Sequence, residues 1–474
     1  MDNDKRFSDP AFQDNPFYRT WMQTYLAWCR GLDDLVDASS LAPADASRAR
    51  FGLGLLTDAL APTNTLLGNP AALRKFFDTG GASAARGLTH MLEDVATNHG
   101  MPSQVDKSAF KVGGNLACTP GSVVYRNEVL ELIQYAPATP TVFKRPLLAI
   151  PPQINKFYVL DLAPGRSLLE FVVRSGMQTF VVSWRNPTAA QRDWGLDTYL
   201  AAVIEATDAV RDITASEDLN VMAACSGGIT TALLLRKLAA AHDARVHSAT
   251  FMVTALDGGI ESQLGLLATP AAIEAARLRS RQKGMLEGHE LAQAFAWLRA
   301  NDLVWPYWVN NYLLGEDPRA FDILYWNNDT TNLPARLHSD FLDLLGKTID
   351  LSDVVLDSYV IAGVTDHITP WKSCYQTTQV VGGQSEFVLS SSGHVQSIIN
   401  PPGNPKASFL LNAQPAKDAD TWMAGAQQHA GSWWEHWRTW LTARSAGRRR
   451  ASSRPGNRRY RASAPAPGTY VLQN

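Results

Sequence analysis

The sequence predicts an α/β protein in which helices cover a mainly parallel sheet. From about residue 120 onward, short apolar runs alternate with segments of helix-favouring composition, a pattern typical of a parallel sheet. One run, residues 219–224, leads through small residues into a helix-like segment at 229–238. An aspartate and a histidine follow two later runs. Reacting groups collect at the carboxyl ends of parallel strands, so we expect these side chains to lie close together.

Size and composition are those of a globular protein with a large core. The chain has 474 residues, 45% of them hydrophobic and 19% charged, so two or three domains are expected. The formal net charge of −2 gives no sign of a nucleic-acid partner. Four scattered cysteines without a CxxC pair indicate neither a zinc site nor a disulfide framework, and a reduced, cytoplasmic setting fits best. We expect neither a secretory signal nor a transmembrane helix, because no apolar stretch is long enough.

Residues 1–110 are predicted to form an N-terminal helical accessory region. Apolar residues recur at three-to-four spacing over 17–35 and 48–60, and another helix is expected over 84–97. No catalytic constellation occurs in this region, so its role is an accessory one.

Residues 111–440 are predicted to form the catalytic domain, with a cap insertion at about 256–350. Helices are expected at 167–175 and 196–213, and apolar composition predicts strands at 130–135, 146–150, 179–184, 219–224, 246–253, 358–363 and 386–389. The insertion is too long for a simple crossover and is rich in aromatic residues. These aromatics form the insertion's own core, or the walls of a cap that holds an acyl chain, or both.

Residues 441–474 are predicted to be a mobile, Arg-rich tail. A Trp-rich, helix-like segment ends near residue 441, and eight arginines then follow among Ser, Pro, Gly and Ala. Burial in such a run is too small to offset the entropy cost of ordering it. A solvated tail is therefore favoured, with attraction to an anionic surface as the alternative.

The turn after residues 219–224 has the pattern of a nucleophile elbow. Cys225 lies between the small residues Ala223 and Gly227, which lets the backbone pass close by while the turn holds the central residue in a strained conformation. A buried structural cysteine is the alternative interpretation, because free cysteine is among the most buried residue types.

Candidate partners for Cys225 lie at the ends of the two later strands. Asp366 follows the strand at 358–363, and His394 follows the strand at 386–389. The order nucleophile, acid, histidine is that of an α/β-hydrolase fold, in which the histidine takes the proton of the nucleophile and the acid orients the histidine. The sequence therefore predicts Cys225, Asp366 and His394 as the catalytic residues.

Two other side chains compete for these roles. His367 is adjacent to Asp366 and would struggle to reach Cys225 from the same turn, so we interpret it as structural. Asp302 lies within the insertion and follows no clear strand end, so we interpret it as a cap residue.

A cysteine at this position favours acyl transfer between thioesters. The thiolate is a strong nucleophile and a good leaving group, which suits transfer from coenzyme A. The oxyanion formed on attack needs backbone donors, for which we predict Ser226 after the nucleophile and Ile154 or Asn155 in the loop at 151–156.

Several motifs in this order resemble the polyhydroxyalkanoate synthases. They cover most of residues 110–440 and are PPQINKFY at 151–158, VSWRNP at 182–187, DWGL at 193–196, ACSGG at 224–228, WVNNY at 308–312, WNND at 326–329, DHITPW at 366–371, and GH at 393–394 through NPPGNPK at 400–406. The sequences of the motifs at 182–187 and 400–406 are most similar to those of class II enzymes, which prefer medium-length side chains.

The resemblance implies a function and a set of roles. Cys225 would carry the growing chain as a thioester, His394 would activate it, and Asp366 would assist the substrate hydroxyl. The implied substrate is 3-hydroxyacyl-CoA and the products are polyester and free CoA, with no metal or organic cofactor. A homodimer bound to storage granules in the cytoplasm is also implied.

The chain departs from the family pattern in three places. Ala223 stands where the family has glycine, the N-terminal region is shorter, and the Arg-rich tail is unusual. Two other functions remain as alternatives: a thioesterase or depolymerase, in which water takes the acyl group, and a granule-coating protein that has lost catalysis.

Overall fold

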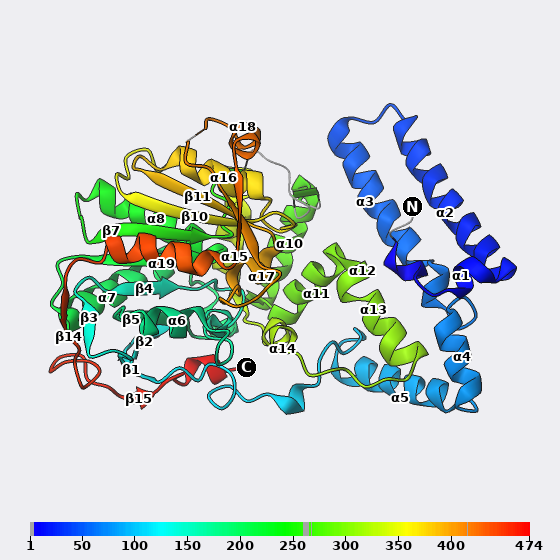
Figure 1. The fold of residues 1–474 in the computed structure, drawn as a ribbon, viewed down its shortest axis with the longest axis horizontal. Helices are drawn as coiled ribbons and strands as arrows, with labels where there is room; N and C mark the ends of the chain where they lie inside the picture. Colours follow the sequence, from blue (N-terminus) through cyan, green and yellow to red (C-terminus); the bar gives the residue numbers. More distant parts are fainter. Residues whose placement is uncertain (1–3, 259–264, 267, 415) are drawn as a thin grey trace. The chain divides into compact units, whose positions relative to one another are not determined.

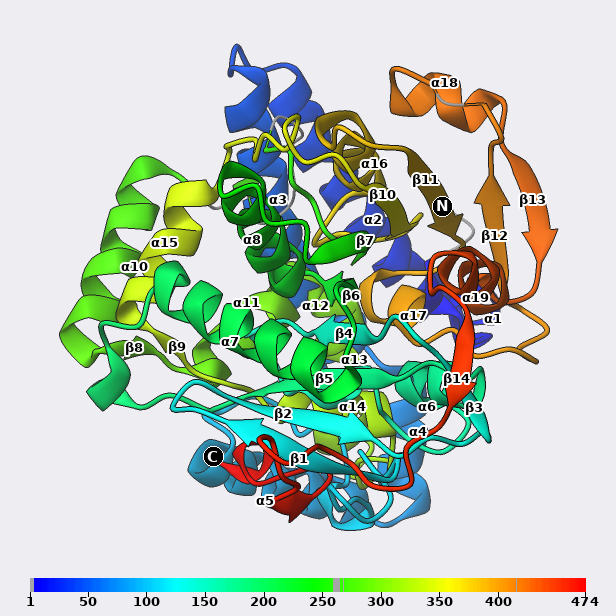
Figure 2. The same ribbon diagram turned by 90° about the vertical axis from the view of Figure 1, so that its left-hand side faces the viewer.

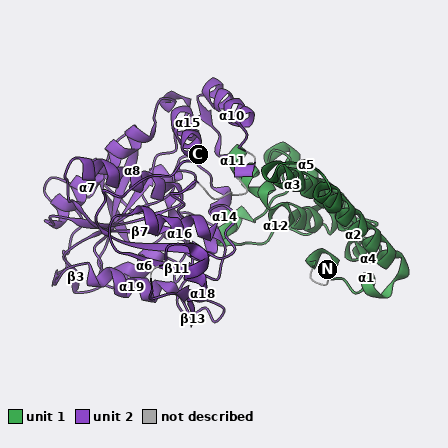
Figure 3. Cartoon of the chain, turned by 90° about the horizontal axis from the view of Figure 1, so that it is seen from above, with its two compact units in different colours: residues 1–109, 289–325 green, residues 110–288, 326–474 purple. Residues whose placement is uncertain are grey.

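The computed structural model describes residues 4–258, 265–266, 268–414 and 416–474 (Figure 1). The described residues divide into two compact units (Figure 3). We call residues 1–109 and 289–325 the helical unit, and residues 110–288 and 326–474 the sheet unit.

Among the described residues, the sheet unit contains an 11-stranded sheet of order β13-β12-β11-β10-β7-β6-β4-β5-β2-β1-β15. The parallel centre consists of β5 (Thr179–Trp184), β4 (Leu147–Ile150), β6 (Leu219–Ala224), β7 (Val246–Met252), β10 (Asp357–Gly363) and β11 (Ser385–Ser390). Antiparallel strands extend it on both sides, namely β2 (Leu130–Tyr135), β1 (Gly121–Arg126), β15 (Ala464–Pro465), β12 (Ser408–Leu411) and β13 (Gln427–Ala430). Every strand predicted from the sequence has a counterpart here, and the predicted α/β fold is confirmed.

Helices cover both faces of this sheet. Helices α7 (Leu196–Thr214) and α8 (Ser226–Ala240) lie on one face, and α6 (Leu168–Arg174) and α19 (Trp433–Ala443) lie on the other (Figure 2). Strands β4, β5 and β6 are buried along their whole length, as expected for strands with helices on both sides.

The tryptophans of α19 belong to the core of the sheet unit. Trp433, Trp434 and Trp437 are fully buried. Their indole nitrogens donate hydrogen bonds to the carbonyls of Ser397 (2.7 Å) and Ile398 (3.1 Å) and to the hydroxyl of Thr250 (2.9 Å). Each large ring is therefore buried with its one polar atom satisfied.

The prediction of a mobile tail at 441–474 differs from the structure. Strand β14 (Arg448–Arg450) pairs with β3 (Thr141–Phe143), and β15 pairs with β1. The 3₁₀ turn η7 (Tyr470–Leu472) buries Tyr470. Composition misled the prediction, because it does not reveal the backbone pairing, the arginine stacking and the burial of Tyr470 and Val471 that order the tail. The Arg448 guanidinium lies 4.5 Å from the Phe143 ring centroid.

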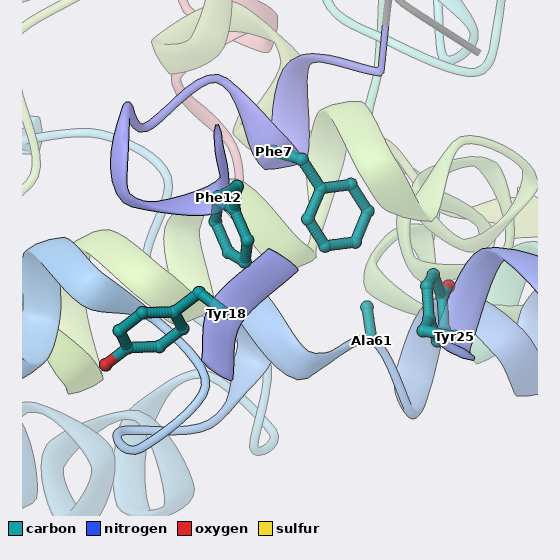
Figure 4. Close-up of a cluster of buried hydrophobic side chains, with 5 residues drawn as sticks. All are labelled: Phe7, Phe12, Tyr18, Tyr25 and Ala61. Atoms are coloured by element: carbon teal, nitrogen blue, oxygen red, sulfur yellow. The ribbon is translucent and has the colours of Figure 1, made fainter. Parts of the chain in front are cut away.

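The helical unit joins segments that are far apart in the sequence. Its helices include α1 (Ala11–Asp14), α2 (Pro16–Asp37), α3 (Pro43–Ala59), α4 (Pro70–Asp78), α5 (Ala82–Thr97), α12 (Ala300–Leu303), α13 (Trp305–Tyr307) and the π-helical turn η6 (Trp308–Leu313). One core cluster comprises Phe7, Phe12, Tyr18, Tyr25 and Ala61 (Figure 4).

The middle of the predicted cap insertion belongs to this helical unit. The indole of Trp308 donates to the carbonyl of Asn64 (3.1 Å), and the hydroxyl of Tyr312 donates to Asp94 (2.8 Å). The flanks of the insertion stay with the sheet unit, where β8 (Met285–Leu286) pairs with β9 (Leu333–Pro334) and α10 (Pro270–Lys283) accompanies α15 (Ala335–Leu344). Some of the insertion's aromatics therefore form a core with the N-terminal helices.

In the described part of the chain, no helix is both long and apolar enough to cross a bilayer.

Candidate active site

Cys225 occupies a strained turn between β6 and α8. Its φ of 50° and ψ of −123° lie outside the regions that a side chain ordinarily allows. The Cys225 N–H donates to the carbonyl of Met252 on the adjacent strand (3.0 Å), and its own carbonyl accepts from Gly228 (2.9 Å). The turn is thus held by the sheet and by the first turn of α8, as a nucleophile elbow requires.

The residues that follow Cys225 must be small, because neighbouring atoms lie very close to their backbone. A Cβ atom on Gly227 would lie 2.5 Å from the carbonyl oxygen of Ile150, and one on Gly228 would lie 2.1 Å from Oγ1 of Thr254. Ala223 is fully buried in β6, in register with Ile150 and Phe251. The sheet therefore accommodates the Ala223 methyl group.

The carboxylate of Asp366 and the ring of His394 form a buried pair. Asp366 follows β10, and His394 is the first residue of α17 (His394–Ile398) after β11. Nδ1 of His394 lies 2.7 Å from Oδ2 of Asp366. The other oxygen, Oδ1, accepts the N–H groups of Ile368 (2.9 Å) and Thr369 (3.0 Å). These contacts fix the carboxylate, and the carboxylate in turn fixes the orientation of the imidazole.

The structure brings Cys225 to the same imidazole. The Cys225 side chain lies close enough to His394 to contribute to the raised pKa of that ring. Because Nδ1 faces Asp366, Nε2 is the nitrogen left for the thiol. The three residues predicted from the sequence are therefore adjacent, in the order thiol, imidazole, carboxylate.

The charge of this pair is set by its partners. Burial lowers the pKa of His394, but the Asp366 carboxylate and the hydrogen bond with Cys225 outweigh burial and raise this pKa to about 10. Burial raises the pKa of Asp366, while the His394 charge and its hydrogen bonds more than compensate and leave that pKa below its usual value. The Asp366 carboxylate therefore stabilises the imidazolium that forms when His394 takes a proton.

Thr369 is a site residue that the sequence prediction missed. Its hydroxyl donates to Oδ2 of Asp366 (2.7 Å) and also lies 3.2 Å from Nδ1 of His394. The available signal was its position three residues after Asp366, since an aspartate and a threonine at that spacing commonly form a side-chain-capped turn.

The two competing side chains lie elsewhere in the arrangement. His394, rather than the neighbouring His367, is the ring that joins Asp366 to Cys225. Asp302 belongs to α12 of the helical unit and pairs with Arg299.

The loop at 151–156 lies against the nucleophile turn. The backbone N–H of Gln153 donates to Oγ of Ser226 (3.2 Å), and the carbonyl of Ile154 accepts from the N–H of Thr331 (3.2 Å). Asn155 pairs with Thr330 as an isolated bridge. These contacts position the loop, and the donor roles of Ser226, Ile154 and Asn155 stay predictions.

Cys374 provides an internal contrast to Cys225. It is fully buried in α16 (Trp371–Val380), and its sulfur lies 3.6 Å from the carbonyl of Thr369. Burial raises the pKa of the Cys374 thiol well above its ordinary value. A thiol in this environment is inert, which suits a structural role.

The fold and the site together define a protein of the α/β-hydrolase class with a cysteine at the nucleophile position. Residues 159–401 match the family described as "alpha/beta hydrolase fold", which agrees with the sheet order and the elbow. Residues 3–172 match the family described as "Poly-beta-hydroxybutyrate polymerase (PhaC) N-terminus".

Full-length relatives give the family. The chain is 52% identical to poly(3-hydroxyalkanoate) polymerase 1 and 50% identical to polymerase 2 of Ectopseudomonas oleovorans, in each case over 99% of this chain and 86% of the relative. It is 38% identical to the polymerase subunit PhaC of Cupriavidus necator, over 99% of this chain and 83% of that one. The chain belongs to the poly(3-hydroxyalkanoate) polymerase family, the acyltransferases also called polyhydroxyalkanoate synthases. The resemblance predicted from the motifs, to class II in particular, is confirmed.

Proposed function

We propose that this chain polymerises 3-hydroxyacyl-CoA into polyester through a thioester on Cys225. The observation that supports the proposal best is the position of His394, between the Cys225 thiol and the Asp366 carboxylate. In this geometry one imidazole can take the proton of the nucleophile and return it to the leaving group.

The acylation step transfers the acyl group from one sulfur to another. The sulfur of Cys225 bonds to the carbonyl carbon as the bond to the CoA sulfur breaks. The thiol proton passes to His394 and then to the departing sulfur, so CoA leaves as a free thiol. Since one thioester replaces another, the step is nearly balanced in energy.

Elongation uses the same imidazole. The hydroxyl of a second 3-hydroxyacyl group gives its proton to His394, and its oxygen attacks the thioester carbonyl. An ester bond forms, the bond to Cys225 breaks, and the proton returns to the sulfur. Asp366 acts through His394 in this scheme, because both of its oxygens already accept hydrogen bonds from neighbouring groups.

The test of this proposal is the loss of one sulfur. Cys225→Ala should lower CoA release from a medium-chain 3-hydroxyacyl-CoA by at least about 1,000-fold, as expected for a nucleophile, while the matched control Cys374→Ala retains most activity. Retained turnover in Cys225→Ala would exclude the mechanism. The products of the unmodified protein distinguish the alternative functions. Free 3-hydroxy acid would indicate a thioesterase, and the absence of any turnover by the unmodified protein would indicate a coating protein.

The preference for medium-length side chains is part of the proposal. It rests on the resemblance of the motifs at 182–187 and 400–406 to class II enzymes. The identity is also greater with the two Ectopseudomonas oleovorans polymerases than with the Cupriavidus necator subunit. Competition between 3-hydroxybutyryl-CoA and 3-hydroxydecanoyl-CoA tests it directly. Faster polymerisation of the shorter substrate would contradict it.

We also propose that the protein works as a homodimer on cytoplasmic polyester granules. Three apolar side chains of α5 support attachment to an apolar surface: Leu88, Leu92 and Val95 are 56%, 61% and 63% exposed and share one helix face. Leu88→Glu combined with Leu92→Glu should reduce co-sedimentation with purified granules, and sedimentation equilibrium tests the dimer. Unchanged co-sedimentation would argue against this surface.

That residues 256–350 cap the site stays a prediction.

A further inference from the structure

The end of the chain is seated on two buried charged groups of the sheet unit. We call residues 468–474, which follow β15, the C-terminal strap. Strand β15 pairs with β1 at the edge of the sheet, with Ser122 opposite Pro465. From there the strap contacts Glu131 on β2 and Lys156 in the loop at 151–156.

The first anchor is the carboxylate of Glu131, which is fully buried. It accepts hydrogen bonds from the N–H of Thr469 (2.8 Å), the hydroxyl of Thr469 (2.9 Å) and the N–H of Tyr470 (2.9 Å), and it pairs with Arg126. A buried carboxylate needs such donors, because an unpaired charge in the interior is costly. The strap is therefore an integral part of the folded sheet unit.

The shape of the strap is adapted to this anchor. Gly468 has a φ of +82°, and a Cβ atom there would lie 2.3 Å from Oε2 of Glu131. The guanidinium groups of Arg126 and Arg185 lie 5.4 Å and 5.7 Å from the Tyr470 ring centroid. A glycine and an aromatic ring are thus both required at these positions.

The second anchor is the ammonium group of Lys156. Lys156 is 3% exposed, and its Nζ donates to the backbone carbonyl of Gln473. The side-chain amide of Asn186 donates to the same carbonyl (3.5 Å). The last residues of the chain thus supply an acceptor to a buried cation in a loop more than three hundred residues earlier.

Lys156 belongs to the loop that contacts the nucleophile turn. The carbonyl of Lys156 accepts from the indole of Trp326 (2.8 Å), and within the same loop Gln153 donates to Ser226, the residue after Cys225. A continuous set of contacts therefore leads from Gln473 through Lys156 and the loop to the elbow. Loop position matters here, since a misplacement of about 1 Å in a catalytic group is enough to slow a reaction by about 100-fold.

We propose that the C-terminal strap is a positioning element for acyl transfer: by binding Lys156, Gln473 holds the loop at 151–156 in the position that oxyanion stabilisation needs. The inference rests on the proposed function and on the prediction that this loop contributes a backbone donor to the oxyanion. Lys156 is a positioning residue and contacts no reacting atom in this scheme.

The experiment separates positioning of the loop from integrity of the nucleophile. Lys156→Met removes the ammonium group, Lys156→Arg is the conservative variant, and deletion of residues 473–474 removes the acceptor while leaving Thr469 and Tyr470 on Glu131. Asn474→Ala is the matched control, because it leaves the Gln473 carbonyl within a peptide bond. Two rates are measured in the full-length protein: CoA release from 3-hydroxyacyl-CoA, and alkylation of Cys225 by iodoacetamide, which forms no oxyanion.

The proposal predicts a selective loss. Lys156→Met and the deletion of 473–474 should each lower kcat for CoA release by about 10- to 100-fold, with the alkylation rate of Cys225 within about 2-fold of the unmodified protein. Lys156→Met combined with the deletion should lower kcat no more than either change alone, because both break the same contact. Lys156→Arg should recover part of kcat.

Two results would overturn the proposal. Normal kcat in both variants would mean that the strap does not act on the site. Parallel loss of alkylation and kcat would mean that the strap only stabilises the fold. Failure of the proposed function is distinguishable, since Cys225→Ala would then retain turnover whatever the strap variants do.

Discussion

At the scale of the residue, the contact between His394 and Asp366 governs the chemistry. The carboxylate lies 2.7 Å from Nδ1 and is a main reason that the pKa of His394 is raised. A charged partner in a buried site both orients the ring and stabilises the imidazolium that forms during acylation. The ionisation of His394 is therefore the property to perturb.

Asp366→Asn should lower both the pKa of His394 and the rate. The neutral amide keeps the size of the side chain but removes the charge that raises the His394 pKa to about 10, so that pKa should fall. We expect kcat to drop by about 1,000- to 10,000-fold, as in other triads that lose their carboxylate. Titration of the His394 ring by NMR measures the shift, and an unchanged pKa in the variant would show that Asp366 does not set it.

The same pair predicts how stability depends on pH. The folded-state pKa of His394 lies above its ordinary 6.5, so its stabilising contribution is complete below pH 6.5 and is lost as pH rises through about 10. The folded-state pKa of Asp366 lies below 3.8, so its contribution is complete above pH 3.8 and is lost in stronger acid. The difference in unfolding free energy between the unmodified protein and His394→Gln should therefore be largest from pH 3.8 to pH 6.5 and shrink toward pH 10.

Denaturant unfolding at several pH values checks this prediction. The unmodified protein and His394→Gln are measured at each pH, and because they differ only at residue 394, other pH effects are shared by both. A difference that grew between pH 7 and pH 10 would contradict the stated direction of the His394 shift.

Sequence reasoning reached some site residues and missed others for a physical reason. Cys225, Asp366 and His394 each follow a strand, and strand ends can be read from local apolar runs. Thr369 has a local signal in its spacing from Asp366. Lys156 matters through a contact with Gln473, which is distant in the sequence, and no local pattern reveals such a contact.

At the scale of the element, the strand-turn-helix around Cys225 has almost no free space. Gly227 crosses the end of β4, where its missing side chain faces the carbonyl oxygens of Ile150 and Pro151. Gly393 differs, because a Cβ atom there would be 3.5 Å from its nearest neighbour, Oγ1 of Thr365. The two glycines therefore form a matched pair.

Gly227→Ala should damage the elbow, and Gly393→Ala should be tolerated. The added methyl at Gly227 would lie 2.5 Å from the Ile150 oxygen, so backbone must move, at a cost of about 1–3 kcal/mol. We expect a lower unfolding free energy together with lost alkylation of Cys225 by iodoacetamide. Equal stability and activity for the two variants would show that the close crossing has no consequence.

Elements at the chain's end were the least predictable. The sequence predicts the strands of the parallel centre, because buried strands appear as continuous apolar runs. Strands β14 and β15 carry arginine, alanine and proline, and their order comes from pairing with β3 and β1. Composition alone cannot reveal a backbone partner, which is why the tail was expected to be mobile.

At the scale of the whole molecule, chain order and spatial grouping differ. Residues 289–325 lie inside the catalytic part of the sequence, yet they form a compact unit with residues 1–109. Helical periodicity predicted the individual N-terminal helices, but it reports only local structure. The partnership of Trp308 with Asn64 and of Tyr312 with Asp94 spans more than two hundred residues, so it required the folded structure.

Gly87→Ala tests this grouping against the matched control Gly54→Ala. A Cβ atom on Gly87 in α5 would lie 1.9 Å from the carbonyl oxygen of Tyr312, whereas one on Gly54 in α3 meets no heavy atom within 4 Å. Gly54→Ala should stabilise by about 0.5–1 kcal/mol, because alanine favours a helix, while Gly87→Ala should lower the thermal midpoint. Similar midpoints for both variants would mean that α5 and residues 308–313 are not closely packed.

The measurement that tests the central claim most directly is the location of the acyl group during turnover. The protein is mixed with a medium-chain 3-hydroxyacyl-CoA, quenched in acid and digested, and the peptides are analysed by mass spectrometry. We predict a thioester-linked hydroxyacyl adduct on Cys225, absent from Cys225→Ala and sensitive to hydroxylamine. Turnover with no adduct on Cys225, or with the adduct on Cys374, would contradict it.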